Sequence, residues 1–311
     1  MHAPYANKAF PIPLVAAVGP GSQPEEEGFD YLPMPKGMAT YHPQVLPEPE
    51  VLAAQQGCVR ALRETLAALR ALHASGLAAA PTKVIDLGEL TDDDRLLLNQ
   101  VLGEGEVAAQ VRTTFPVPQV AASANRVHVQ ESVFAGVWRV LHLGAEGQVL
   151  RDRIEVGAVP QPLLDAAAED GIRAPAPHEA AQPSPALPEG VMNAPSLLAE
   201  LEQQRRLWKP GDAPHVINLT LLPLTPADSE FLTEQVGEGR VVILSRGYGN
   251  CRITTTRLPR TWRVTYFNST DINILDTLEV CRVPEVACAS LEDLEDSAQR
   301  LAEVLDWVEA P

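Results

Sequence analysis

One pattern of residues occurs twice in the chain, and this repeat constrains the fold more than any other feature of the sequence. The run VWRV at 137–140 recurs 124 residues later as TWRV at 261–264. The other matched blocks, in chain order, are 84–87 with 216–219, 91–94 with 225–228, 103–105 with 237–239, 152–156 with 276–280, and 159–160 with 283–284. Because the blocks keep the same order, they predict two copies of one structural unit, with insertions placed in loops.

Each copy has the residue pattern of an α+β unit. Apolar residues at helical spacing predict a first helix at 50–74 and its counterpart at 195–207. A short apolar strand follows, at 84–89 and 215–222. Next comes a helix, which Thr91 or Thr225 caps and a glycine ends.

Four further strands are predicted in each copy, because polar and apolar residues alternate along them. They lie at 106–113, 127–134, 137–143 and 149–156, and at 240–246, 251–257, 261–267 and 273–281. The closing helix at 290–308 has a short counterpart at 161–169. The fold class we expect is α+β: two tandem, internally duplicated units, each a mainly antiparallel sheet with helices packed on one face.

The 28 prolines indicate where the units begin and end. They cluster in residues 1–49 and again in 173–194, where fixed φ angles and missing N–H donors disfavour helices and central strands. We therefore expect a proline-rich irregular arm at 1–49, a first repeat at 50–172, a linker at 173–194 and a second repeat at 195–311.

Composition and missing motifs exclude several functions. A formal net charge of −17 disfavours binding to nucleic acid, and no apolar run approaches the roughly 18 residues of a membrane span. The first residues lack a signal-peptide pattern, and four cysteines do not make a disulfide framework, so we expect a cytoplasmic protein. P-loop, zinc-protease and nucleophile-elbow motifs are absent from the sequence, so we expect no cofactor and no enzyme.

Two turns of the second copy are candidates for binding a partner. The first spans 245–252, where a hairpin turn alone explains the glycines. The second spans 266–271, where an Asx-type turn with core aromatic residues is the structural alternative. Tyrosine and arginine are favoured interface anchors, and the first copy lacks comparable residues around 141–145. The candidate partner-binding residues are Arg246, Tyr248, Asn250, Tyr266, Asn268 and Asp271.

Three cysteines of the second copy provide an alternative. Cys251, Cys281 and Cys288 would be the ligands of an iron or Fe–S carrier, although their spacing differs from the short pairs typical of zinc sites. Burial as structural thiols is the simpler interpretation, and we expect Cys58 to pack in the first helix. A small-ligand enzyme with a cleft between the repeats is a third hypothesis, which the missing acid–base motifs disfavour.

Several runs resemble one protein family. GEGRVVILSRGYGNCRI at 237–253, TWRVTYFNS at 261–269, ILDTLEV at 274–280 and VPEVACASLEDLEDS at 283–297 resemble the C-terminal region of the HupH/HyaF (HoxQ) family. The arm also resembles the N-terminus of that family, at Ile12-Pro13, at GPGSQ in 19–23 and at Met34-Pro35.

The resemblance implies an accessory protein for expression and formation of a [NiFe] hydrogenase. It implies binding to the Fe–S small-subunit precursor before twin-arginine export, together with a thioredoxin-like companion of the HyaE/HupG type. It assigns no catalytic residues. Partners that are nucleic acids, and insertion into a membrane, are not expected.

Overall fold

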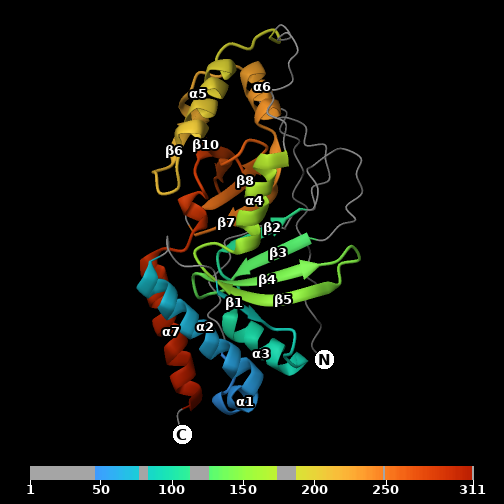
Figure 1. Ribbon diagram of the computed structural model, residues 1–311, viewed down its shortest axis with the longest axis vertical. Helices are drawn as coiled ribbons and strands as arrows, with labels where there is room; N and C mark the ends of the chain where they lie inside the picture. Colours follow the sequence, from blue (N-terminus) through green and yellow to red (C-terminus); the bar gives the residue numbers. More distant parts are fainter. Residues whose placement is uncertain (1–45, 77–82, 113–125, 174–186, 248, 310–311) are drawn as a thin grey trace, which may run out of the picture. The chain divides into compact units, whose positions relative to one another are not determined.

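Ten strands of both copies form one sheet in the computed structural model (Figure 1), which describes residues 46–76, 83–112, 126–173, 187–247 and 249–309. The first copy contributes β1 (Lys83–Asp86), β2 (Val107–Val111), β3 (Arg126–Glu131), β4 (Val137–Leu143) and β5 (Val149–Val156). The second contributes β6 (His215–Asn218), β7 (Glu238–Ser245), β8 (Asn250–Thr256), β9 (Thr261–Phe267) and β10 (Asn273–Val280). All described residues belong to the unit Gln44–Pro311.

The strand order is β1-β5-β4-β3-β2-β7-β8-β9-β10-β6, so each strand of one copy has its counterpart at the mirrored place. The copies meet at the antiparallel pair β2–β7, where Ala109 lies opposite Ile243. An approximate two-fold axis therefore passes through the middle of the sheet. The sequence predicted two antiparallel units, and the structure joins their sheets through two strands that would otherwise be exposed edges.

Seven α-helices and two 3₁₀ turns occur among the described residues. They are α1 (Pro49–Ala54), α2 (Gln56–Ser75), α3 (Asp92–Leu102), α4 (Gln161–Arg173), α5 (Ala194–Leu207), η1 (Leu219–Leu221), α6 (Pro226–Val236), η2 (Glu285–Ala287) and α7 (Leu291–Glu309). The first predicted helix is divided at Gln55, and α4 is longer than the expected 161–169. No helix in the described ranges is both long and apolar enough to span a bilayer.

The copies share local details that the matched blocks predicted. Thr91 and Thr225 each cap a helix in a reciprocal capping box, with Asp94 or Asp228 as the partner three residues later. Each of these buried aspartates also accepts a hydrogen bond from the backbone at the start of the preceding long helix, through Cys58 N or Ala194 N. The same bonding at both places shows that the sequence repeat is a structural repeat.

The repeated run at the centre of each copy supplies two more paired features. Trp138 and Trp262 are fully buried, and each indole N–H donates to a backbone carbonyl beyond the last strand of its copy. The next residue in each run, Arg139 or Arg263, forms a bidentate ion pair with the matched aspartate, Asp152 or Asp276. Bidentate geometry fixes the register of the last two long strands in each copy.

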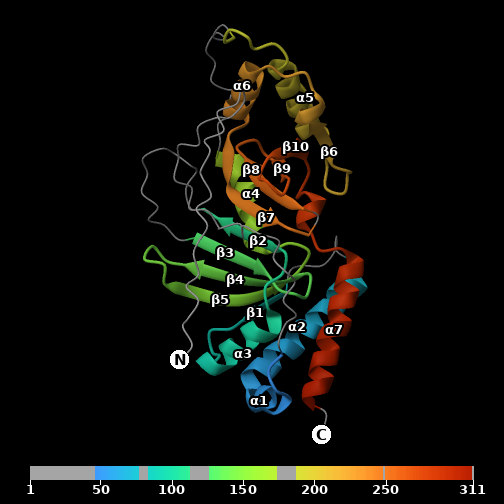
Figure 2. The ribbon, with the colours of Figure 1, turned by 180° about the vertical axis from the view of Figure 1, so that it is seen from behind.

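Helices cover both faces of the sheet (Figures 1 and 2), which corrects the expectation of helices on one face only. Successive residues show this, because Val137 belongs to the core beneath α2, α3 and α7, and Trp138 belongs to the core beneath α4 and η2. A third core lies between α5, α6, β6 and β10. An apolar stripe along a helix predicts that this side of the helix is buried, but it does not specify which face of a sheet the helix covers. The sequence therefore did not determine the face.

The two closing helices occupy different places. Helix α7, from the second copy, lies beside α2 and α1 of the first copy (Figures 1 and 2). Helix α4, from the first copy, packs on β7, β8 and β2 at the centre of the sheet. The proline-rich arm and most of the predicted linker lie outside the described residues, so their expected structure stays a prediction.

Candidate partner-binding surface

The two candidate turns lie at the same end of the second copy's half of the sheet. Ser245 pairs with Cys251 where β7 turns into β8, and Asn250 pairs with Phe267 at the end of β9. Phe267 in turn pairs with Asn273 at the start of β10. The turn after β7 and the turn after β9 are therefore separated by about two strand spacings, or roughly 10 Å.

The turn after β7 is fixed by contacts with the first copy. The N–H of Arg246 donates to the carbonyl of Glu106 at 3.1 Å. A Cβ at Gly247 would come within 2.3 Å of the Glu106 Oε2 atom, so a side chain there requires the Glu106 carboxylate to move. Arg246 itself is exposed, and Asn250 is partly exposed. Tyr248 lies outside the described residues.

The turn after β9 is organised by the side chain of Asn268. Its Oδ1 accepts hydrogen bonds from Thr270 N at 2.9 Å and from Ile272 N at 2.9 Å. The predicted Asx-type turn is thus present, and it uses the Asn268 side chain to hold the loop. Asn268 positions this turn, and the residues that the turn presents to solvent are its neighbours.

Asp271 occupies a backbone conformation that favours glycine. Its φ is 59°, and the matched position in the first copy is Gly147, with φ 81°. The two turns have the same closing bond, Asn268 N to Ile272 O at 2.9 Å and Gly144 N to Gln148 O at 2.8 Å. An aspartate at positive φ is tolerated but strained relative to glycine, so the second copy carries a carboxylate where the fold alone favours glycine.

Tyr266 is placed differently from the other candidates. It packs against the central core opposite Cys251, and burial raises the pKa of its phenol to about 12. Its ring therefore packs beneath the turns, as the alternative of a core aromatic residue predicted. The side chain remains partly exposed.

Two exposed apolar side chains adjoin these turns and were not among the residues predicted from the sequence. Ile272 is 60% exposed and Ile274 is 55% exposed. Ile274 lies in β10, where the register shifts between Asn273 and Leu275, and Ile272 lies in the turn just before that strand. We define the hairpin-tip surface as Arg246, Asn250, Asn268, Asp271 and Ile272.

The three candidate ligand cysteines have the environment of core thiols. Cys251 and Cys281 are buried, and Cys288 is partly buried. Burial raises the pKa of Cys251 and of Cys288 to about 12 and raises that of Cys281 further. Within the described ranges, no three His, Cys, Asp or Glu residues are grouped so that they hold a metal ion. A thiol with a raised pKa is a poor nucleophile and a poor ligand at neutral pH.

Taken together, the fold defines a class of protein: a duplicated α+β chain with one shared sheet, whose second copy carries polar and apolar side chains at two of its turns. A family model described as the HupH hydrogenase expression protein, C-terminal conserved region, matches residues 57–178 and again residues 191–308. The double match agrees with the structural repeat. The chain belongs to the HupH family, as the resemblance indicated.

Three relatives cover nearly the whole chain. It is 48% identical to the hydrogenase expression/formation protein HoxQ of Cupriavidus necator, over 96% of this chain and 98% of that protein. It is 46% identical to the hydrogenase expression/formation protein HupH of Rhodobacter capsulatus, over 96% and 98%. It is 34% identical to the hydrogenase-1 operon protein HyaF of Escherichia coli K12, over 94% and 95%.

Proposed function

We propose that the chain is an accessory protein in the maturation of an uptake [NiFe] hydrogenase, and that it binds the Fe–S small-subunit precursor before twin-arginine export. The observation that carries the first part is the family membership, since relatives similar over their full length are named for hydrogenase expression and formation. A thioredoxin-like companion of the HyaE/HupG type is the second partner that we propose.

The hairpin-tip surface supports binding rather than catalysis. It combines an exposed arginine, an exposed isoleucine and a carboxylate held at an unfavourable φ, on turns that hydrogen bonds fix in place. Pre-organised turns lose little entropy on binding, and arginine and apolar anchors are typical of interface hot spots. We infer that the second copy is the specialised one and that the first serves as its scaffold.

Net charge supports the choice of partner. A twin-arginine signal is basic, and the chain has a formal net charge of −17. Long-range attraction raises the association rate of oppositely charged partners and weakens as salt increases. A dependence on ionic strength is therefore expected for capture of the precursor, with the local contacts at the hairpin tips supplying specificity.

The experiment is an affinity co-purification from cells that are producing the hydrogenase. Tagged wild-type protein is expected to recover the small-subunit precursor, and Arg246→Ala is expected to recover at least tenfold less. The control is Glu146→Ala, in the first-copy turn that corresponds to the turn after β9, which is expected to recover the wild-type amount. Recovery of no hydrogenase subunit by the wild type, or equal loss in both variants, contradicts the proposal.

A further inference from the structure

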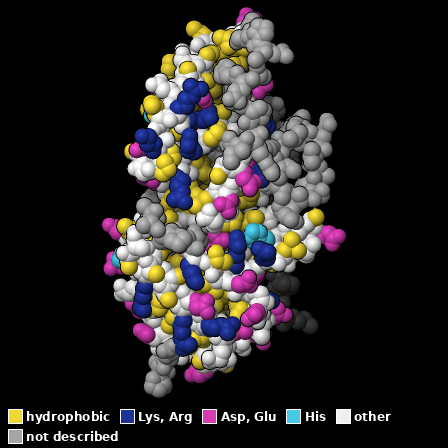
Figure 3. Space-filling model, viewed as in Figure 1, with side chains coloured by type: hydrophobic (Ala, Val, Ile, Leu, Met, Phe, Trp, Pro, Cys, Tyr) yellow, Lys and Arg dark blue, Asp and Glu magenta, His cyan; other side chains and the backbone are white. Residues whose placement is uncertain are grey.

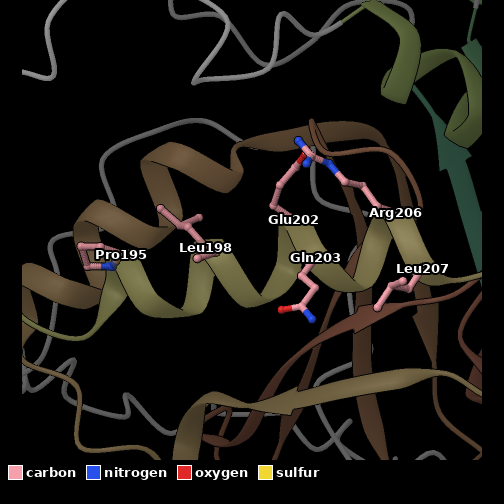
Figure 4. Close-up of a pocket in the computed structure, with 7 residues that line it drawn as sticks. Pro195, Leu198, Glu202, Gln203, Arg206 and Leu207 are labelled. Carbon is pink, nitrogen blue, oxygen red and sulfur yellow. The ribbon is translucent and has the colours of Figure 1, made fainter.

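The depression along helix α5 is open, and its charges are already paired. Figure 3 shows Lys and Arg side chains interspersed with hydrophobic ones in the region where Figure 1 places α5. The depression has a volume of about 470 Å³ (Figure 4), and residues of α5 alone line it. Its Glu202 and Arg206 side chains pair with each other at 2.7 Å. The edges of the sheet differ more clearly between the two copies.

The two edge strands of the sheet, β1 and β6, occupy matched positions of the repeat. Each has four residues, and each has one neighbour among the described strands, β5 or β10. Lys83 pairs with Val156 in the first copy, and His215 pairs with Val280 in the second. The backbone N–H and C=O groups on the outer side of an edge strand can pair with a further strand, unless side chains prevent it.

Of these two strands, β1 carries the charged side chains that protect an edge. It begins with Lys83 and ends with Asp86, and both are exposed. The matched residues of β6 are His215 and Asn218. His215 Nε2 lies 2.8 Å from Glu200 Oε1, and Asn218 caps the turn η1. Charge on an edge strand, lysine above all, is a common device against edge-to-edge pairing, and β6 lacks it.

The turn after β6 adds exposed apolar side chains beside this edge. Val216 on β6 is 51% exposed, and its counterpart Val84 on β1 is 44% exposed. The turn after β6 is two residues longer than the turn after β1, and in it Leu221 is 79% exposed and Leu222 is 36% exposed. The shorter turn of the first copy exposes Glu89 instead. The second copy therefore has an uncharged edge with apolar neighbours.

Hydrogen bonds fix the turn that presents Leu221. Leu221 N donates to Asn218 Oδ1 at 3.3 Å, and Asp276 N on β10 donates to Thr220 Oγ1 at 2.8 Å. The exposed leucine is thus held in a defined place next to the edge strand. Most of its apolar surface stays in water, so burying it against another protein surface is favourable.

We propose that β6 pairs edge to edge with β6 of a second molecule of this chain, which forms a two-fold dimer. The chain uses this arrangement internally, because the matched strands β2 and β7 pair antiparallel and Ala109 lies opposite its own counterpart, Ile243. The same geometry at β6 places Val216 opposite Val216 of the second molecule, with Leu221 of both molecules beside the pair. A two-fold contact brings a surface against itself, so it suits an edge without charges that would repel each other.

The sequence of β6 meets this requirement. Its four residues include no Lys, Arg, Asp or Glu, and β-branched residues such as its valine and isoleucine pack well across strands. The inference does not depend on the proposed function, since the edge of β6 is a different surface from the hairpin tips.

The test is sedimentation velocity of the full-length chain at about 1–100 μM, because micromolar dissociation constants are the weak end of the range for specific interfaces. The wild type is expected to pass from monomer to dimer. Val216→Lys places a charge on the edge and is expected to weaken dimerisation at least tenfold. The matched control is Val84→Lys on β1, which is expected to dimerise as the wild type does. Circular dichroism checks that both variants are folded.

Ionic strength gives a second readout. Each molecule has a formal net charge of −17, so salt screens the repulsion between two molecules. Dimerisation through an uncharged edge is therefore expected to strengthen as salt increases, whereas capture of the basic precursor is expected to weaken.

Four results overturn the inference. The first is a wild type that stays monomeric at every concentration. The second is dimerisation that Val216→Lys leaves unchanged or that Val84→Lys weakens equally. The third is dimerisation that weakens as salt increases, which would indicate an ionic contact. The fourth is association beyond the dimer, because pairing of β6 with β1 of another molecule is head-to-tail and does not close.

Discussion

Asp170 on α4 and Arg240 on β7 form a buried ion pair that joins the two copies of the repeat. The Arg240 Nε donates to Asp170 Oδ1 at 2.5 Å, and Arg240 N and Thr255 Oγ1 both donate to Oδ2, at 2.7 and 2.9 Å. Both side chains are almost completely buried. Because the carboxylate comes from the first copy and its three donors come from the second, the pair specifies how the copies are joined.

Removal of this carboxylate is expected to destabilise the fold strongly. Asp170→Ala removes the buried carboxylate and leaves the Arg240 guanidinium paired with the partly exposed Glu169, which we expect to cost about 3 kcal/mol of unfolding free energy. Denaturant unfolding measures this change in the free energy of unfolding. The control is Asp296→Ala, which breaks the exposed pair with Arg300 and is expected to cost less than about 0.5 kcal/mol. Similar costs for the two variants would show that the Asp170–Arg240 pair does not hold the copies together.

Glu131 is expected to make the protein less stable as pH rises through neutrality. Burial, with the nearby carboxylates of Glu106 and Asp293, raises the pKa of Glu131 to about 7. A raised folded-state pKa means that the stabilisation is complete below the unfolded pKa, near 4.3, and is lost as pH rises through about 7.

Glu131→Gln should therefore match the wild type near pH 4 and exceed it at pH 8 by about 2–4 kcal/mol. Thermal and denaturant unfolding across this pH range measure the difference. A constant difference between the two proteins from pH 4 to pH 8 would contradict the raised pKa.

The strain at Asp271 predicts a trade-off between stability and binding. Asp271→Gly restores the residue type of the first copy at a φ of 59°, so we expect unfolding free energy to rise by about 0.5–1 kcal/mol. Recovery of the precursor in co-purification should fall at the same time, because the carboxylate is lost from the hairpin-tip surface. Increased stability with full recovery would show that Asp271 has no part in binding.

The thiols are expected to be unreactive in the folded protein. Cys58 and Cys251 are buried, and burial raises the pKa of each to about 12. At pH 8 a negligible fraction of either thiol is ionised, so iodoacetamide should label them at least a hundredfold more slowly than in denaturant. Mass spectrometry of timed samples gives the rates. Rapid labelling of native Cys251, Cys281 and Cys288 would favour the hypothesis of an iron or Fe–S carrier.

The repeat and its strands were predictable because strand alternation and capping are local properties of the sequence. The Thr91 and Thr225 capping boxes and the Trp138 and Trp262 strands illustrate this. The joining of β2 to β7 was not predictable, since edge pairing depends on backbone hydrogen bonds that any side-chain pattern permits. The different positions of α4 and α7 were not predictable for a related reason, because an apolar stripe on a helix does not specify which surface it packs against.

For the site, both turns followed from their glycine and asparagine residues, but the exposure of Ile272 did not. The predicted strand began at 273, so Ile272 precedes it, and the side-chain pattern of a strand does not specify the exposure of a turn residue. The position of Tyr266 at the core also needed the structure, because an aromatic residue near a turn is consistent with either packing or exposure.

The most direct test of the account is site-specific photo-crosslinking in cells that are producing the hydrogenase. A photoreactive residue replaces Arg246 in one full-length chain. In another it replaces Glu146, in the first-copy turn that corresponds to the turn after β9. We expect a crosslink from position 246 to the small-subunit precursor and none from position 146. No crosslink from position 246, or equal crosslinks from both positions, would contradict the claim that the second copy's hairpin tips bind the precursor.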